Sequence, residues 1–182
     1  MSLRTFKDNP YVIRFLVEQA CLSAISGTGF HHDGGINWDS LPATIIEDDL
    51  IQAIPSVDCE IFFVPENPFC KDIDALYLKV DVEKETALVV PIQITVAKTH
   101  KDSEAAFYSQ WYNWQERFRG YELKTTFVWV VENTQSWAVM EEEFRTTRHQ
   151  SRLIFPEHEQ IIMTVTDISR TVGLYLRELR TR

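Results

Sequence analysis

The spacing of apolar residues predicts two helices in the first third of the chain. After Asn9-Pro10, apolar residues recur at helical intervals as far as Ile25, with proline in the first turn and Gly27 at the exit. We therefore expect a core-facing helix there. A glycine-rich loop follows over 27–35, and the pattern from about Pro42 to Ala53 predicts a second helix.

β-branched and aromatic residues mark three strands after that helix. The ranges expected to be extended are Val57–Val64, Ala75–Val82 and Ala87–Ala97, with a hairpin turn at Glu83–Thr86 between the second and the third. The third strand is almost wholly apolar at its start, which predicts a central position covered on both faces of a sheet.

The second half of the chain predicts three helices and two strands. In chain order these are a helix over Asp102–Arg119 that stops at Gly120, a strand over Thr125–Val131, a helix around Trp137–Arg148, a strand over Gln160–Thr166 and a final helix capped by Asp167, with Val172, Tyr175, Leu176 and Leu179 as its apolar stripe. The order of elements predicts an α/β fold with a mixed sheet flanked by helices. Because no linker or repeat interrupts it, residues 1–182 are expected to form a single domain.

Composition adds an expectation about the compartment. The chain has 182 residues, of which 45% are hydrophobic and 25% charged, as in ordinary globular domains. No apolar stretch approaches the ~20 residues of a membrane span, and no signal segment opens the chain. The three cysteines are odd in number and lack CxxC spacing, so we expect free thiols in an intracellular, reducing compartment, with no membrane partner.

Charge is distributed very unevenly. Between Phe15 and Cys70 there is no Lys or Arg but there are nine acidic residues, which equals the whole net charge of −9. A nucleic-acid-binding face would have to come from the second half of the chain. The acidity weighs against DNA binding without excluding it, because nuclease sites concentrate carboxylates around metal ions.

One pair of polar residues stands out at the predicted hairpin. Asp74 lies at the entry of one strand, and Gln93 and Thr95 point to one side of its partner strand, so Asp74 and Gln93 are expected side by side. An acid beside an oxygen ligand is how a hard divalent cation is held next to a phosphate. A solvated sheet rim is the alternative interpretation of the same spacing.

These residues also resemble a known family. The segments that carry the resemblance are Ile61-Phe62-Phe63-Val64-Pro65, Asp74-Ala75, Ile92-Gln93-Ile94-Thr95-Val96 and His100. They look like the C-terminal domain of Crinkler effectors and of trypanosome retrotransposon hot spot proteins, which are similar to the PD-(D/E)XK, or restriction-endonuclease-like, nuclease superfamily. The resemblance covers about residues 57–131 and implies an αβββαβ core.

The resemblance implies a DNA endonuclease that needs Mg²⁺, with Mn²⁺ as a substitute. Asp74 takes the place of the first metal-binding acid, Gln93 that of the Asp or Glu of the motif, and Thr95 that of its Lys. Glu18 on the first helix would complete a metal site with Asp74 and Gln93. Lys98 would assist the attacking water, with Lys101 as a second candidate for the displaced lysine.

Two departures from the motif keep a second function open. Gln93 is a neutral and weaker metal ligand, and Thr95 has no ammonium group to orient water. The alternative is therefore a catalytically inactive module on the same fold that binds nucleic acid or a host protein. In either case the resemblance implies that the protein acts inside a cell, in a nucleus, which includes the nucleus of a host cell.

Two further regions offer nucleic-acid contacts. On the predicted 102–119 helix, Phe107, Trp111, Trp114 and Phe118 have the spacing of a core stripe, which leaves Tyr108 and Tyr112 as surface contacts for bases. The densest basic patch consists of Arg145, Arg148, His149 and Arg152, which follow the acidic run at 141–143 and could track a phosphate backbone. Ion pairs with that acidic run explain the arginines equally well.

Overall fold

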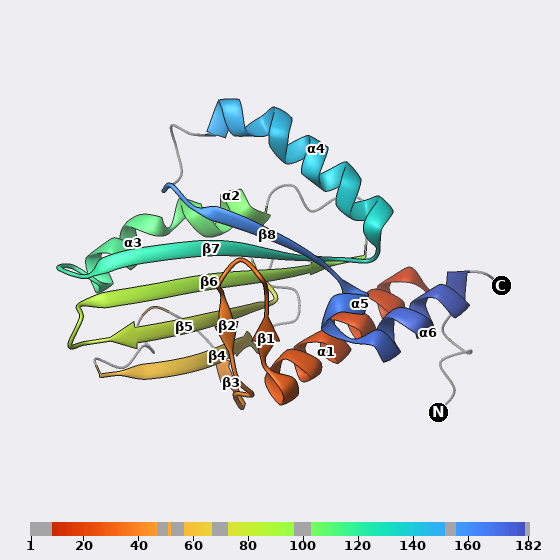
Figure 1. The fold of residues 1–182 in the computed structure, drawn as a ribbon, viewed down its shortest axis with the longest axis horizontal. Coiled ribbons are helices and arrows are strands. Elements are labelled where there is room, and N and C mark those ends of the chain that lie inside the picture. The colour runs from red at the N-terminus through yellow and green to blue at the C-terminus, as the bar shows by residue number, and fades with distance from the viewer. Residues whose placement is uncertain are drawn as a thin grey trace.

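The computed structural model describes residues 9–46, 51, 57–66, 73–96, 103–151 and 156–180. Its centre is a six-stranded mixed sheet with helices on both faces, which confirms the predicted α/β class (Figure 1). In spatial order the strands are β3 (Ala43–Ile46), β4 (Cys59–Pro65), β5 (Ala75–Asp81), β6 (Thr86–Thr95), β7 (Glu122–Val131) and β8 (Glu159–Thr164).

The sheet combines an antiparallel meander with a parallel half. Strands β4, β5 and β6 pair antiparallel, whereas β6, β7 and β8 are parallel to one another. The parallel connections run through helices, as they must to return to the same end of the sheet. These are α2 (Ser103–Ser109) and α3 (Trp111–Arg117) before β7, and α4 (Thr134–Ser151) before β8. Strand β6 is central and buried on both sides, as its apolar sequence predicted.

Helix α1 (Pro10–Thr28) begins and ends at residues suited to those positions. The Asn9 side chain accepts hydrogen bonds from two backbone N–H groups of the first turn, and proline follows at the first helical position. The helix passes Gly27, the predicted exit, and ends at Gly29, whose φ of 82° only glycine adopts readily. A Cβ at Gly29 would also lie 2.3 Å from the carbonyl oxygen of Trp38.

The predicted glycine-rich loop contains a small hairpin formed by β1 (Phe30–His31) and β2 (Asn37–Trp38). The indole of Trp38 stacks between the rings of Phe30 and Tyr77, with centroid distances of 4.5 and 4.1 Å. This stack attaches the hairpin to the sheet face that α1 covers. Two-residue strands leave almost no alternation in the sequence, so the pattern gave no signal for them.

The prediction of a helix over Pro42–Ala53 is wrong for its first part. Ala43–Ile46 form β3, which pairs parallel to β4 at the edge of the sheet. Thr44 and Ile45 are β-branched, and pairing with a neighbouring strand overrides the weak helical spacing. Residues 47–50 and 52–56 lie outside the described part of the chain.

Two apolar layers lie on opposite faces of the sheet. One contains α1, the β1–β2 hairpin, α5 (Val165–Ile168) and α6 (Arg170–Arg180), and the other contains α2 and α3 (Figure 1). Asp167 was expected to cap the final helix but instead lies within α5, where it forms a capping box with Thr164. Of the predicted apolar stripe on the final helix, Leu176 is buried and Tyr175 is exposed.

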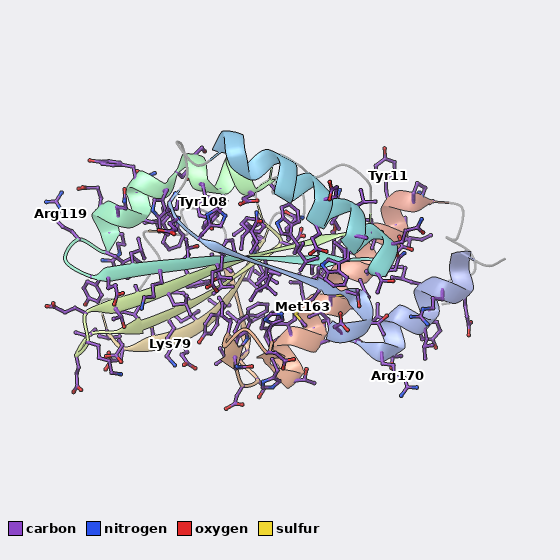
Figure 2. All side chains as sticks on the ribbon, turned by 45° about the horizontal axis from the view of Figure 1, so that its top comes forward. Tyr11, Lys79, Tyr108, Arg119, Met163 and Arg170 are labelled. Carbon is purple, nitrogen blue, oxygen red and sulfur yellow. The ribbon has the colours of Figure 1, made fainter. Side chains whose placement is uncertain are left out.

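The predicted 102–119 helix is divided at Gln110 into α2 and α3. Its expected core stripe is confirmed, because all four of those aromatic residues are buried. Tyr108 was predicted at the surface and is buried instead, with its hydroxyl 3.1 Å from that of Thr125 and its ring against His158 (Figure 2). Tyr112 is 68% exposed, as predicted.

A polar cluster that includes His158 lies beside the Tyr108 ring. Glu104 of α2 accepts hydrogen bonds from Gln160 Nε2 on both carboxylate oxygens, at 2.9 and 2.8 Å, and also contacts His158 Nε2. The other ring nitrogen of His158 lies 2.8 Å from the carbonyl oxygen of Pro156. The cluster connects α2 to the start of β8, and its groups satisfy one another's hydrogen-bonding capacity.

Candidate functional site

Asp74 lies where strands β5 and β6 separate. Its backbone N–H still donates to the carbonyl of Ile92, at 2.9 Å. Its carboxylate oxygen Oδ2 accepts two hydrogen bonds, from the backbone N–H of Ile94 at 2.6 Å and from Nε2 of Gln93 at 2.5 Å. Beyond the last backbone pair between the two strands, the Asp74 side chain thus accepts the hydrogen bond of the Ile94 N–H on β6. The predicted placement of Asp74 beside Gln93 is confirmed.

Glu18 of α1 faces the same carboxylate. Glu18 is only 5% exposed, and burial raises its pKa, while its ion pair with Arg14 opposes that rise. Burial, and next the negative charge of Glu18, raise the pKa of Asp74 from 3.8 to about 7. The fold therefore holds two carboxylates close enough to repel each other, in a place where little water screens them.

Cys21 lies next to this pair on α1. Burial, followed by the charges of Glu18 and Asp74, raises the pKa of its thiol to about 12. At neutral pH the thiol is protonated and hence a poor nucleophile. Cys21 and Cys59 are both free, as predicted, whereas Cys70 lies outside the described residues.

Glu18 and Gln93 reach Asp74 from different sides of the sheet. Ile92 and Ile94 of β6 pack in the apolar layer that contains α1, so Gln93, which alternates with them, points to the other face. Both residues act on the Asp74 carboxylate. The amide nitrogen of Gln93 donates a hydrogen bond that orients the Asp74 carboxylate, and the negative charge of Glu18 raises the pKa of Asp74.

The donor set suits a hard divalent cation. Within the described residues, the hydrogen bonds of Asp74 go to Oδ2 and the ion pair of Glu18 to Oε1, so each acid keeps a second oxygen without a partner. Gln93 Oε1 is fully buried and has no hydrogen-bond partner there either. Oxygen ligands are what Mg²⁺ and Mn²⁺ prefer. No three His, Cys, Asp or Glu side chains of the described residues form a metal-binding group.

The lysine of the motif has no counterpart inside this site. Thr95, at the corresponding position, is buried and has an interaction partner of its own. Lys98 and Lys101 fall within 97–102, outside the described residues, so the role assigned to Lys98 stays a prediction. The positive charge that acts on Asp74 belongs to Arg14, one helical turn before Glu18.

Sequence reasoning missed Arg14, although two signals were present. Arg14 and Glu18 are four residues apart on a predicted helix, where opposite charges pair readily. Arg14 is also the only Lys or Arg from position 8 to position 70. A lone cation in so acidic a stretch, one turn from a candidate metal-binding acid, was a usable indication.

The side chains of Arg145, Arg148 and His149, and the whole of Arg152, lie outside the described part, so the basic patch stays a prediction. His32 lies at the turn of the β1–β2 hairpin, where its Nδ1 accepts a hydrogen bond from the N–H of Gly34 at 3.0 Å. None of the described helices has the length and apolar character to cross a bilayer.

Comparison of the chain with known protein families, with curated proteins and with solved structures finds no match. A function must therefore be inferred from the site itself.

Proposed function

We propose that this chain is a metal-dependent nuclease domain of the restriction-endonuclease-like type, which hydrolyses DNA phosphodiester bonds. The observation that carries the proposal is a buried carboxylate, Glu18, whose charge acts on a half-buried one, Asp74, at the point where β5 and β6 separate. Such a pair costs free energy in the absence of a cation, and strongly perturbed acids of this kind are concentrated at functional sites.

The order of the elements supports the same assignment. Helix α1, the meander β4–β5–β6, the crossover through α2 and α3, and the parallel strand β7 follow the αβββαβ order that the family resemblance implies. Asp74, just before the second meander strand, and Gln93, in the third, are the residues that the resemblance assigns to the two motif positions. The β1–β2 hairpin, β3 and β8 are additions to that core.

Each residue of the site has a defined role in this proposal. Glu18 and Asp74 hold Mg²⁺, and Gln93, which points to the other face of the sheet, acts by holding Asp74 in place through its amide nitrogen. The bound cation supplies Lewis-acid polarisation of the phosphodiester. The Ile94 N–H and the Gln93 amide keep Asp74 in one orientation, so its other oxygen is directed consistently. Lys98 remains the candidate group for assisting the attacking water.

An inactive binding module is the second candidate function. Thr95 favours it, because a buried hydroxyl at the lysine position supplies no positive charge to the reaction. In that case the chain binds nucleic acid or a host protein without cleaving it. The resemblance implies an effector role and a nuclear location for the nuclease and for the inactive binding module alike.

Cleavage of plasmid DNA tests the proposal. We expect the wild-type chain to cut in Mg²⁺ or Mn²⁺ and not in EDTA, and Asp74→Ala to lower the rate about 10³-fold or more, since a metal-binding acid contributes several kcal/mol to the transition state. Asp81→Ala is the matched control, because Asp81 ends the same strand and pairs with Lys84 at the surface. Cleavage in EDTA, or by Asp74→Ala at the wild-type rate, would contradict the proposal.

A further inference from the structure

One face of α1 leads from solvent to the carboxylate pair. Tyr11, Arg14, Phe15 and Glu18 are three or four residues apart and therefore share one side of the helix. Tyr11 is 82% exposed and Phe15 45%, whereas Glu18 is almost completely buried. Figure 2 shows Tyr11 extending outward from the first turn of the helix. Two aromatic side chains and one cation thus share the side of α1 that carries Glu18.

Arg14 has free capacity to bind an anion. Its Nε pairs with Glu18, while its terminal nitrogens Nη1 and Nη2 form no hydrogen bond with any described residue. The side chain is 31% exposed, so this end of the guanidinium is accessible. A planar guanidinium with two free nitrogens binds a phosphate group in a bidentate manner.

The two aromatic residues add a preference for unpaired bases. An exposed tyrosine and phenylalanine beside a cation match the way that single strands are bound, with rings stacked on bases and positive charge on the backbone. Base faces are hidden in a duplex, so these rings would gain little from double-stranded DNA.

We propose that the Tyr11–Arg14–Phe15 face of α1 binds an unpaired nucleic-acid strand, with Arg14 on a phosphate and the two rings on bases, and leads that strand to Glu18 and Asp74. This inference deepens the proposed function and rests on it for the fate of the strand. The binding step can be measured without cleavage.

Binding of a labelled oligothymidylate to the full chain in EDTA provides the test. We expect Tyr11→Ala and Phe15→Ala each to weaken binding about tenfold. Arg14→Gln should lower the slope of log K against log salt by about 0.7, because one phosphate contact is lost. A duplex of the same length should bind more weakly than the single strand.

Two variants outside α1 serve as matched controls. Tyr175→Ala on α6 removes a tyrosine that is also well exposed, and Arg119→Gln, just after α3, removes an exposed arginine that also pairs with a glutamate. Both controls should bind the oligonucleotide as the wild type does. Equal loss in the controls and the α1 variants, or no binding of the single strand at low salt, would overturn the inference.

Cleavage assays separate this inference from the proposed function. If the wild type cuts DNA with Mg²⁺ and the α1 variants bind and cut normally, the nuclease proposal stands and the inference fails. If the wild type never cuts but the α1 variants lose binding as expected, the inference stands and the nuclease proposal fails.

Discussion

Replacing Asp74 by asparagine is expected to raise the melting temperature of the metal-free protein by about 4 to 8 °C at pH 8. The folded state raises the pKa of Asp74 from 3.8 to about 7, so ionisation of this carboxyl opposes folding. This rise in the pKa of Asp74 corresponds to about 4 kcal/mol, and we expect about half of that because the carboxyl is partly exposed. About 2 kcal/mol amounts to that temperature shift in a domain of this size.

The sign of the effect defines its pH window. Because the folded-state pKa is raised, the folded protein binds the proton more tightly, and this group lowers stability progressively as pH rises from about 4 to 7. The asparagine variant should therefore gain most at pH 8 and almost nothing near pH 4. The amide oxygen of the introduced asparagine can accept the same hydrogen bonds from Ile94 and Gln93, so little packing should be lost. Thermal unfolding across this range measures the difference.

Mg²⁺ gives an independent control for the same variant. A cation bound by Glu18 and Asp74 stabilises the folded chain in proportion to its binding. Saturating Mg²⁺ should raise the wild-type melting temperature at pH 8 and leave Asp74→Asn unchanged. A metal-free wild type that melts at the same temperature as the variant at pH 8 would show that the carboxylate pair is not strained. A wild type that Mg²⁺ does not stabilise would show that the pair is not a cation site.

Replacing Trp38 by alanine is expected to cost about 3 to 5 kcal/mol, or about 6 to 20 °C in melting temperature. Trp38 is 4% exposed and its indole lies between Phe30 and Tyr77, so alanine would leave a large cavity between two rings. It would also release the β1–β2 hairpin from the sheet. Chemical or thermal unfolding measures the loss.

Trp38→Phe separates ring stacking from hydrogen bonding. Trp38 Nε1 is buried and has no hydrogen-bond partner among the described residues, so phenylalanine sacrifices no polar contact. The smaller ring can remain between Phe30 and Tyr77, and we expect a loss well below that of alanine. Equal losses in the two variants would mean that a phenyl ring between Phe30 and Tyr77 restores nothing, so that stability depends on the whole indole rather than on a stacked ring.

Much of the candidate site could be predicted because its residues lie on long, regular elements. The hairpin formed by β5 and β6 has a strict period of two, so its register, and hence the contact of Asp74 with Gln93, follows from the sequence. The capped start of α1 fixed where the helix that carries Glu18 begins. Where elements are short, as in the β1–β2 hairpin and β3, local pattern failed and tertiary pairing determined the structure.

The sequence by itself determined the mixed α/β class, the central position of β6, the buried aromatic stripe of α2 and α3, and the pairing of Asp74 with Gln93. These features depend on periodicity, which is local information. Only the tertiary structure decided that Tyr108 turns inward to Thr125 and His158, and that Glu18 and Arg14 act on Asp74. Burial and electrostatic interaction depend on which distant segments pack together, and no spacing along the chain encodes that directly.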